Sequence, residues 1–281
     1  MESLVSTEWL AQHLAEPGLV VLDASSHLQD AGRDARAEFA AAHIPGARFL
    51  DLATLTDPDS PVPSAMPTGG QFAERMRALG VNDGDRLVIY DDSAVKTSAR
   101  AWFIARIHGV REVAILDDGL GKWRTEGRLL ESGEPAVGPG DFTPSPGSGT
   151  IRFKSDMLAN LGRHTEQVVD ARGRARFTGE EEDFRPGVAP GHIPGSRNLP
   201  YNLLFAHDGT YARPKDLKRA FDEAGIDFAR PVVTTCGSGV TAAVLLFAMH
   251  LLGKADVALY DGSWSEWAAD PATPKKLGPA A

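Results

Sequence analysis

The sequence contains only one cysteine among its 281 residues, Cys236. A single thiol excludes a disulfide within the chain, and it also excludes a metal site built from several cysteines. Any sulfur or redox chemistry carried by cysteine must therefore use Cys236. No other pattern in the sequence indicates a metal ion or an organic cofactor, so we expect neither.

Long hydrophobic runs and blocks of basic residues are also missing. The longest apolar stretch, residues 242–252, is shorter than the ~18 to 20 residues that cross a bilayer. The N-terminus lacks a basic region followed by an apolar one, so no secretory signal is visible. We expect a cytoplasmic protein with no membrane partner. The net charge of −9 disfavours nucleic acid as a partner, because it repels polyanions.

The chain is an internal repeat. The motif His-Ile-Pro-Gly occurs at residues 43–46 and again at 192–195, and Trp123 corresponds to Trp267. Repeats of this length indicate one domain copied twice. We predict domains at residues 1–130 and 151–281, joined by a linker at residues 131–150 that is rich in Gly, Pro and Ser. Residues 271–281 are predicted to be a frayed tail.

Each copy alternates short apolar runs with longer amphipathic segments. In the first copy we predict a strand at residues 87–90 and helices at residues 72–79 and 97–108. Continuous apolar strands that alternate with helices are typical of parallel βαβ units. The predicted fold class is therefore α/β, with a mostly parallel central sheet flanked by helices in each copy.

Cys236 follows a predicted strand at residues 231–235 and precedes the segment Gly237-Ser238-Gly239-Val240-Thr241 and an apolar helix. A glycine-rich turn that opens a helix points backbone N–H groups inward, and the helix N-terminus adds about half a positive charge. Such a cradle favours the thiolate, which is the nucleophilic form. A lone cysteine is more often a small buried hydrophobic residue, but the strand, turn and helix pattern favours a nucleophile.

The sequence argues against two other enzyme classes, cysteine phosphatases and serine hydrolases, and against a catalytic site in the first copy. A cysteine phosphatase needs arginine six residues after the cysteine, where this chain has Ala242. A serine hydrolase needs Gly-x-Ser-x-Gly, whereas Ser238 lies in Cys-Gly-Ser-Gly. The first copy has Asp91 at the cysteine position, so we expect no chemistry there.

These features together resemble the two-domain rhodanese family over nearly the whole chain. The resemblance rests on the tandem copies, a cysteine loop in the second copy alone, and the motif Asp-Gly-x-Trp-x-Glu-Trp at residues 261–267. It implies two tandem rhodanese-like domains, of which only the second carries the catalytic cysteine.

The loop at residues 236–241 is similar to that of the 3-mercaptopyruvate sulfurtransferases. Thiosulfate sulfurtransferases of the family carry Arg and Lys at the positions of Gly237 and Ser238. Thiosulfate is a dianion that gains from cations beside the thiol. Mercaptopyruvate has one carboxylate remote from its sulfur, so it suits a neutral loop with a more distant cationic group.

The resemblance also implies substrate-binding residues. Arg176 and Arg185 match the family's two substrate-binding arginines, although Ala175 stands where that pattern has glycine. Arginine suits bidentate binding of a carboxylate. The loop residues Gly237, Gly239, Val240 and Thr241 would complete the substrate site. The alternative is that both arginines form surface ion pairs with the acidic residues 180–183.

Six polar residues are also assigned roles. The resemblance implies a proton relay from Ser238 through His43 to Asp34, in which the Ser238 hydroxyl polarises the substrate carbonyl or enolate. For His192 we predict a structural turn, with the imidazole bonded to the backbone. Arg172 and Asp170 are predicted to form a structural ion pair.

The activity implied is ping-pong sulfur transfer from 3-mercaptopyruvate, a small-molecule donor, through a persulfide on Cys236, with release of pyruvate. The acceptor would be a thiol such as thioredoxin, or cyanide. Two alternatives stay open: a thiosulfate sulfurtransferase, and a non-catalytic sulfur-carrier or partner-binding module.

Overall fold

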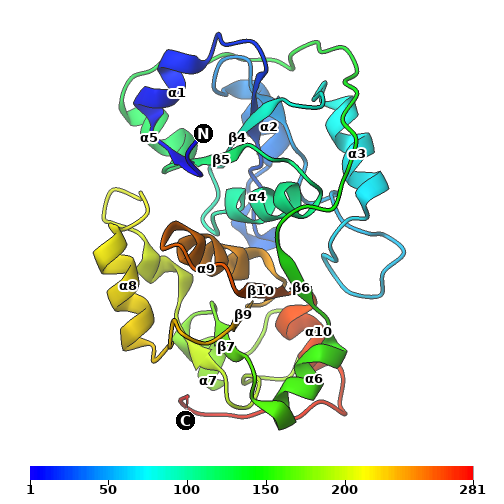
Figure 1. Ribbon diagram of the computed structural model, residues 1–281, viewed down its shortest axis with the longest axis vertical. Helices are drawn as coiled ribbons and strands as arrows, with labels where there is room; N and C mark the ends of the chain where they lie inside the picture. Colours follow the sequence, from blue (N-terminus) through cyan, green and yellow to red (C-terminus); the bar gives the residue numbers. More distant parts are fainter. Residues whose placement is uncertain (281) are drawn as a thin grey trace. The chain divides into compact units, whose positions relative to one another are not determined.

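The computed structural model describes residues 1–280 and divides into two α/β units (Figure 1). The first unit comprises Met1–Asp57, Met66–Ser148 and His207–Thr210. The second comprises Pro58–Ala65, Gly149–Ala206 and the chain from Tyr211 onward. Each unit is described by itself below.

The first unit contains a five-stranded sheet in the order β1-β5-β4-β2-β3, and every neighbouring pair of strands is parallel. Its strands are β1 (Leu4–Val5), β2 (Leu19–Asp23), β3 (Arg48–Phe49), β4 (Arg86–Tyr90) and β5 (Val113–Leu116). Its helices are α1 (Thr7–His13), the 3-10 helix η1 (Gln29–Ala31), α2 (Ala35–Ala41), α3 (Gly69–Ala78), α4 (Ser98–Ile107) and α5 (Gly119–Thr125).

The second unit repeats this topology with the order β6-β10-β9-β7-β8, again all parallel. Its strands are β6 (Thr150–Arg152), β7 (Gln167–Asp170), β8 (Arg197–Asn198), β9 (Val232–Thr235) and β10 (Val257–Tyr260). Its helices are α6 (Lys154–Arg163), α7 (Arg174–Thr178), the 3-10 helix η2 (Tyr201–Leu204), α8 (Pro214–Glu223), α9 (Val240–Leu251) and α10 (Ser263–Ala269). The α/β class with parallel sheets is confirmed.

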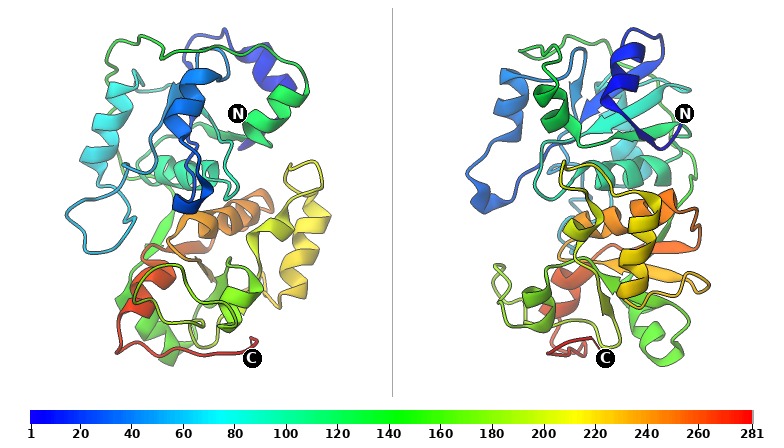
Figure 2. Two further views of the ribbon diagram at one scale, coloured as in Figure 1. Left: turned by 180° about the vertical axis from the view of Figure 1, so that it is seen from behind. Right: turned by 90° about the vertical axis from the view of Figure 1, so that its left-hand side faces the viewer.

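Helices cover both faces of the second sheet (Figure 2). Val233 and Tyr260 lie on the face that packs against α6 and α10, where Met157, Trp264 and Trp267 complete a buried cluster. The intervening strand residues face α9, whose contacts are with β9 and β10. Alternate side chains of a strand point to opposite faces, so burial on both faces explains the continuous apolar runs in the sequence.

Helix starts follow local capping signals. Thr68 and Gln71 form a capping box at the start of α3: the backbone N–H of Gln71 donates to Thr68 Oγ1 at 3.3 Å, and that of Thr68 donates to Gln71 Oε1 at 2.7 Å. The predicted helices at residues 72–79 and 97–108 correspond to α3 and α4. Helix α9 begins at Val240, two residues earlier than predicted, because the sequence analysis placed residues 237–241 in the loop.

The His-Ile-Pro-Gly turn is fixed in the same way in both units. His43 and Glu131 exchange two backbone hydrogen bonds of 2.9 Å, and His192 and Lys276 exchange bonds of 2.9 and 3.0 Å. The end of each repeat therefore returns to its own histidine turn. The predicted frayed tail is wrong as far as residue 278, because the Gly278 N–H also donates to the Thr178 carbonyl at 2.8 Å.

Residues 131–148, most of the predicted linker, have no helix or strand but run along the first unit. The Gly140 N–H donates to the Arg77 carbonyl at 2.9 Å, and the Gly147 N–H donates to the Ile107 carbonyl at 3.0 Å. Backbone hydrogen bonds to helices α3 and α4 therefore hold this segment along the first unit.

Candidate active site

Three segments meet beside the central strand of the second sheet. Strand β9 lies between β10 and β7, and the carboxyl ends of parallel strands share one edge of a sheet, where ligands bind. The loop after β9 contains Cys236, helix α10 after β10 begins at Ser263, and the chain after β7 contains Arg172 and Arg176. The topology therefore gathers the predicted site residues of the second copy at one edge.

The carbonyl groups at the start of the Cys236 loop are bonded to helix α10. The Trp264 N–H donates to the Cys236 carbonyl, and the Ser265 N–H donates to the Gly237 carbonyl, both at 2.9 Å. The Cys236 N–H donates to Ser263 Oγ at 3.2 Å, and that hydroxyl donates to the Tyr260 carbonyl at 2.9 Å. The first turn of α10 therefore fixes the backbone at the thiol.

The following backbone N–H groups remain available to a ligand. No acceptor within the described chain is bonded to the N–H groups of residues 237–241. Gly239 has a φ of 79°, the left-handed conformation that glycine adopts freely, and α9 begins at the next residue. Consecutive unbonded amides at a helix N-terminus form an anion-binding concavity. The predicted amide cradle therefore has the donors it needs.

Cys236 is only 2% exposed, whereas Ser238, Val240 and Thr241 are half-buried. The thiol thus lies at the base of the loop, and the rim residues lie nearer to solvent. The hydrogen bonds at this residue are made by its backbone: its N–H donates to the Ser263 hydroxyl, and its carbonyl accepts from the Trp264 N–H.

Asp183 joins the two predicted substrate-binding arginines. Its side chain is 2% exposed, and it accepts hydrogen bonds from Arg176 Nη2 and from Arg185 Nη1, the latter at 3.0 Å. Burial acts to raise the pKa of Asp183, but the Arg185 N–H and the two guanidinium groups outweigh it and hold the pKa below its usual value. Asp183 is therefore a carboxylate at neutral pH.

The Arg185 guanidinium lies against the cysteine loop. A Cβ atom placed on Gly237 would be 3.1 Å from Arg185 Nη2 and 3.2 Å from Nη1. Both guanidinium groups also lie over the ring of Phe184, with Cζ at 4.4 Å from its centre for Arg185 and 5.2 Å for Arg176. A cation therefore occupies the space beside Gly237, next to the thiol-bearing residue.

The alternative prediction for Arg176 and Arg185 was that they form surface ion pairs with the acidic residues 180–183. They pair with Asp183, one of the acidic residues 180–183, but its side chain is buried, so this is no surface ion pair. The predicted structural pair is confirmed: Arg172 Nη2 donates to Asp170 Oδ2 at 2.7 Å, and both side chains are buried. Arg172 also stacks on Trp264, with Cζ 4.6 Å from the ring centre.

Asp34 and His43 have structural partners instead of each other. Asp34 Oδ1 caps α2 by accepting from the Ala37 N–H at 3.1 Å. His43 is buried, stacks on Phe39 at 4.1 Å, and its Nδ1 bonds the Phe39 carbonyl at 2.8 Å. Within residues 1–280 no hydrogen bond joins Asp34 to His43. Asp34 Oδ1 and His43 Nδ1 are therefore both bonded to backbone groups of helix α2, and the relay stays a prediction.

His192 confirms the structural role predicted for it and matches His43. Its Nδ1 bonds the Phe177 carbonyl at 2.9 Å, and its ring stacks on Phe177 at 3.8 Å. Burial lowers the pKa of His192, more than its bond to the Phe177 carbonyl raises it. The equivalent contacts in both units show that the motif uses histidine to close a turn.

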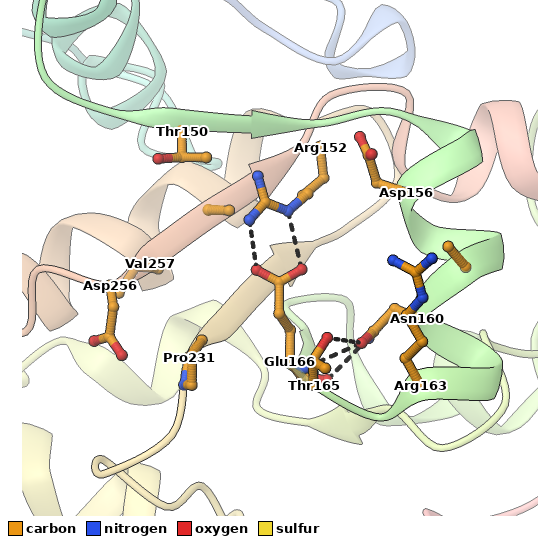
Figure 3. Close-up of a pocket in the computed structure, with 12 residues that line it drawn as sticks. Thr150, Arg152, Asp156, Asn160, Arg163, Thr165, Glu166, Pro231, Asp256 and Val257 are labelled. Atoms are coloured by element: carbon orange, nitrogen blue, oxygen red, sulfur yellow. Dashed lines mark hydrogen bonds and ion pairs between the residues drawn. The ribbon is translucent and has the colours of Figure 1, made fainter.

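A separate hollow of about 530 Å³ lies at the opposite edge of the second sheet (Figure 3). Its lining includes Pro231 and Asp256, which precede β9 and β10, and Arg152, which binds Glu166 through Nε at 2.9 Å and Nη2 at 2.8 Å. The Arg152 guanidinium is therefore already paired, and the hollow lies at the amino ends of the strands, away from the cysteine loop.

Two absences hold for residues 1–280. No group of three or more His, Cys, Asp and Glu side chains in this part of the chain is placed to hold a metal ion. No helix in it is long and apolar enough to cross a membrane.

A duplicated parallel α/β unit with a lone cysteine in an amide loop after the central strand defines the class of tandem rhodanese-like proteins. The family model described as "Rhodanese-like domain" matches residues 6–126 and 154–270. The chain belongs to the rhodanese family.

The names of two similar proteins differ in the sulfur donor that they state. The 3-mercaptopyruvate sulfurtransferase of Mus musculus is 40% identical over 271 residues, which cover 94% of this chain and 91% of the mouse protein. The thiosulfate sulfurtransferase of Cricetulus griseus is 36% identical over 272 residues, with coverage of 94% and 91%.

A solved structure agrees with both the fold and the length. The crystal structure of SseA from Escherichia coli, described as a 3-mercaptopyruvate sulfotransferase, matches with a TM-score of 0.85 and 36% identity. It covers 95% of this chain and 100% of SseA. The chain is therefore an enzyme of the sulfurtransferase class, and the alternative of a non-catalytic module is not retained.

Two residues of this site were not predicted from the sequence. Asp183 was considered only as one of several surface acids, and Ser263 appeared only as the variable position in Asp-Gly-x-Trp. The sequence does hold one signal for Ser263, because the repeat aligns it with Gly119. In the structure both residues have a positive φ, 49° and 57°.

Proposed function

We propose that the chain transfers the sulfur of 3-mercaptopyruvate to a thiol acceptor through a persulfide on Cys236. The row of unbonded amides at residues 237–241 carries this proposal, because it can stabilise first a thiolate and then a persulfide anion. The loop is neutral, and the cations lie at Arg176 and Arg185. That distribution suits a donor whose negative charge is remote from its sulfur.

In the first half-reaction the Cys236 thiolate attacks the sulfur of 3-mercaptopyruvate. The carbon–sulfur bond breaks, its electron pair leaves as the enolate of pyruvate, and a proton on carbon completes pyruvate. Arg176 and Arg185 bind the carboxylate, and the Ser238 hydroxyl donates to the enolate oxygen. The amides of Gly239, Val240 and Thr241 hold the transferred sulfur.

In the second half-reaction an acceptor thiolate attacks the outer sulfur of the Cys236 persulfide. The sulfur–sulfur bond breaks, the acceptor leaves as a persulfide, and Cys236 returns as thiolate. A dithiol acceptor such as thioredoxin fits this step, and cyanide can replace it in an assay to give thiocyanate. None of these steps uses a metal or an organic cofactor.

Mass spectrometry combined with a pyruvate assay tests this proposal. After exposure to 3-mercaptopyruvate, the Cys236 peptide should gain one sulfur atom and lose it to added thiol, and pyruvate should form over many turnovers. Cys236→Ser should do neither. Failure of the wild-type protein to release pyruvate would contradict the proposal.

Thiosulfate is the second candidate donor, favoured by the similarity to the hamster thiosulfate sulfurtransferase. Comparison of kcat/KM for the two donors on the wild-type protein separates the candidates. We expect 3-mercaptopyruvate to be preferred, because Gly237 and Ser238 carry no charge and the cation beside Gly237, Arg185, is paired with Asp183. A preference for thiosulfate would reverse this assignment.

A further inference from the structure

The arginine cluster beside the cysteine loop has a third member, the buried carboxylate of Asp183. It bonds both guanidinium groups and also accepts from the Arg185 backbone N–H at 3.1 Å. Two cations and one anion leave the cluster with one net positive charge. A binding site of this charge complements a monoanion better than a dianion.

We propose that Asp183 selects the sulfur donor, by positioning Arg176 and Arg185 and by limiting the positive charge of their site. This inference rests on the proposed function, since it assumes that the two arginines bind the donor. Mercaptopyruvate carries one carboxylate and thiosulfate carries two negative charges. Asp183 therefore disfavours thiosulfate more than it disfavours mercaptopyruvate.

The contacts of Asp183 fit a positioning role. Arg185 uses Nη1 and its backbone N–H on Asp183, and its guanidinium lies beside Gly237. Arg176 uses Nη2, and its buried Nε has no hydrogen-bond partner among the described residues. A shared carboxylate thus fixes one edge of each guanidinium and leaves other N–H groups free for a ligand.

The sequence offers a matched pair of variants. Asp183→Asn removes the charge with little change in volume and keeps an oxygen for the Arg185 N–H. Glu182→Gln makes the same change of charge at the adjacent residue, whose side chain is exposed. Comparison of the two separates the charge held between the arginines from the net charge of the segment, which is screened by solvent.

The measurement is the ratio of kcat/KM for thiosulfate to kcat/KM for 3-mercaptopyruvate. We expect Asp183→Asn to raise this ratio roughly tenfold, mainly through KM, because a dianion gains more than a monoanion from the added positive charge. Glu182→Gln should leave the ratio within about twofold of wild type. Asp183→Glu, which restores the charge, should return the ratio toward wild type.

Two results would overturn the inference. One is an unchanged ratio in a folded Asp183→Asn protein whose wild type releases pyruvate from 3-mercaptopyruvate, and this result would leave the proposed function intact. If wild type does not release pyruvate, the proposed function fails first.

The second result comes from inhibition of the wild-type protein, a test without a variant. Pyruvate, a monoanion, should compete with the donor more strongly than sulfate does, and the reverse order would also overturn the inference.

Discussion

Ser263 and Gly119 occupy equivalent positions in the two units and show what one side chain adds. Both have left-handed backbone, with φ of 49° and 57°. A Cβ atom on Gly119 would lie 2.1 Å from the Asp91 carbonyl, so only glycine fits there. Ser263 bears the cost of a left-handed non-glycine residue, about 1 kcal/mol, and its hydroxyl accepts the Cys236 N–H. Strain at this residue coincides with a contact to the nucleophile.

Replacement of Ser263 should therefore affect reactivity more than stability. We expect both Ser263→Gly and Ser263→Ala to slow alkylation of Cys236 by iodoacetamide several-fold, because the loop loses the bond at its first amide. The free energy of unfolding should be higher in Ser263→Gly than in Ser263→Ala by about 1 kcal/mol, since glycine relieves the strain. Wild-type alkylation rates in both variants would show that the hydroxyl does not hold the loop.

Arg176 and Arg185 should affect donor binding and leave the reactivity of the Cys236 thiol unchanged. We expect Arg176→Gln and Arg185→Gln each to raise KM for 3-mercaptopyruvate about tenfold or more, because a charge-assisted hydrogen bond to the carboxylate is lost. Alkylation of Cys236 by uncharged iodoacetamide should change little. Arg174→Gln is the matched control, since Arg174 is exposed on the same helix, α7. An equal effect of all three variants would contradict a specific clamp.

Strands β2 and β7 are equivalent elements that end in the same residue type with different neighbours. β7 ends in Asp170, which is paired with Arg172. β2 ends in Asp23, which has Ser25 at the corresponding position and accepts from the Ser25 N–H at 2.9 Å. Burial raises the pKa of Asp23 to about 6, although hydrogen bonds from Ser25 and Tyr90 oppose the shift. The first unit thus holds a carboxyl group without a cation.

This difference predicts a pH dependence of stability. The folded pKa of Asp23 lies above its unfolded value, so its stabilising contribution is present below pH ~4 and is lost as the pH rises through about 6. At pH 8, Asp23→Asn should therefore have a free energy of unfolding higher than that of wild type by on the order of 2 kcal/mol, measured by urea denaturation. At pH 4 the two proteins should be close. An equal difference at both pH values would refute this assignment.

The elements that could be predicted from sequence are those with a clear pattern. The strand at residues 87–90 and helix α4 are long apolar or amphipathic runs, and the glycines around Ser238 mark the loop after β9. Strands β1, β3 and β8 have two residues each and carry no period. Asp183 and Ser263 could not be assigned, because their roles depend on which groups the folded chain brings beside them.

At the scale of the whole molecule, duplication supplied the fold twice but the site residues once. The loop after β4 has Asp91 in place of the cysteine. Its side-chain carboxyl group accepts from the Ser93 and Ser98 N–H groups, both at 2.8 Å, and burial raises its pKa. The first unit therefore bonds the N–H groups of this loop with its own side chain, whereas the second leaves the amides of residues 237–241 unbonded.

The side chain of Asp91 is covalently part of the chain, so no solute can displace it from the loop after β4, whereas the amides of residues 237–241 are open to a ligand. Because Cys236 is the one cysteine of the chain, titration with donor should plateau at one sulfane sulfur per polypeptide, although the chain holds two copies of the fold.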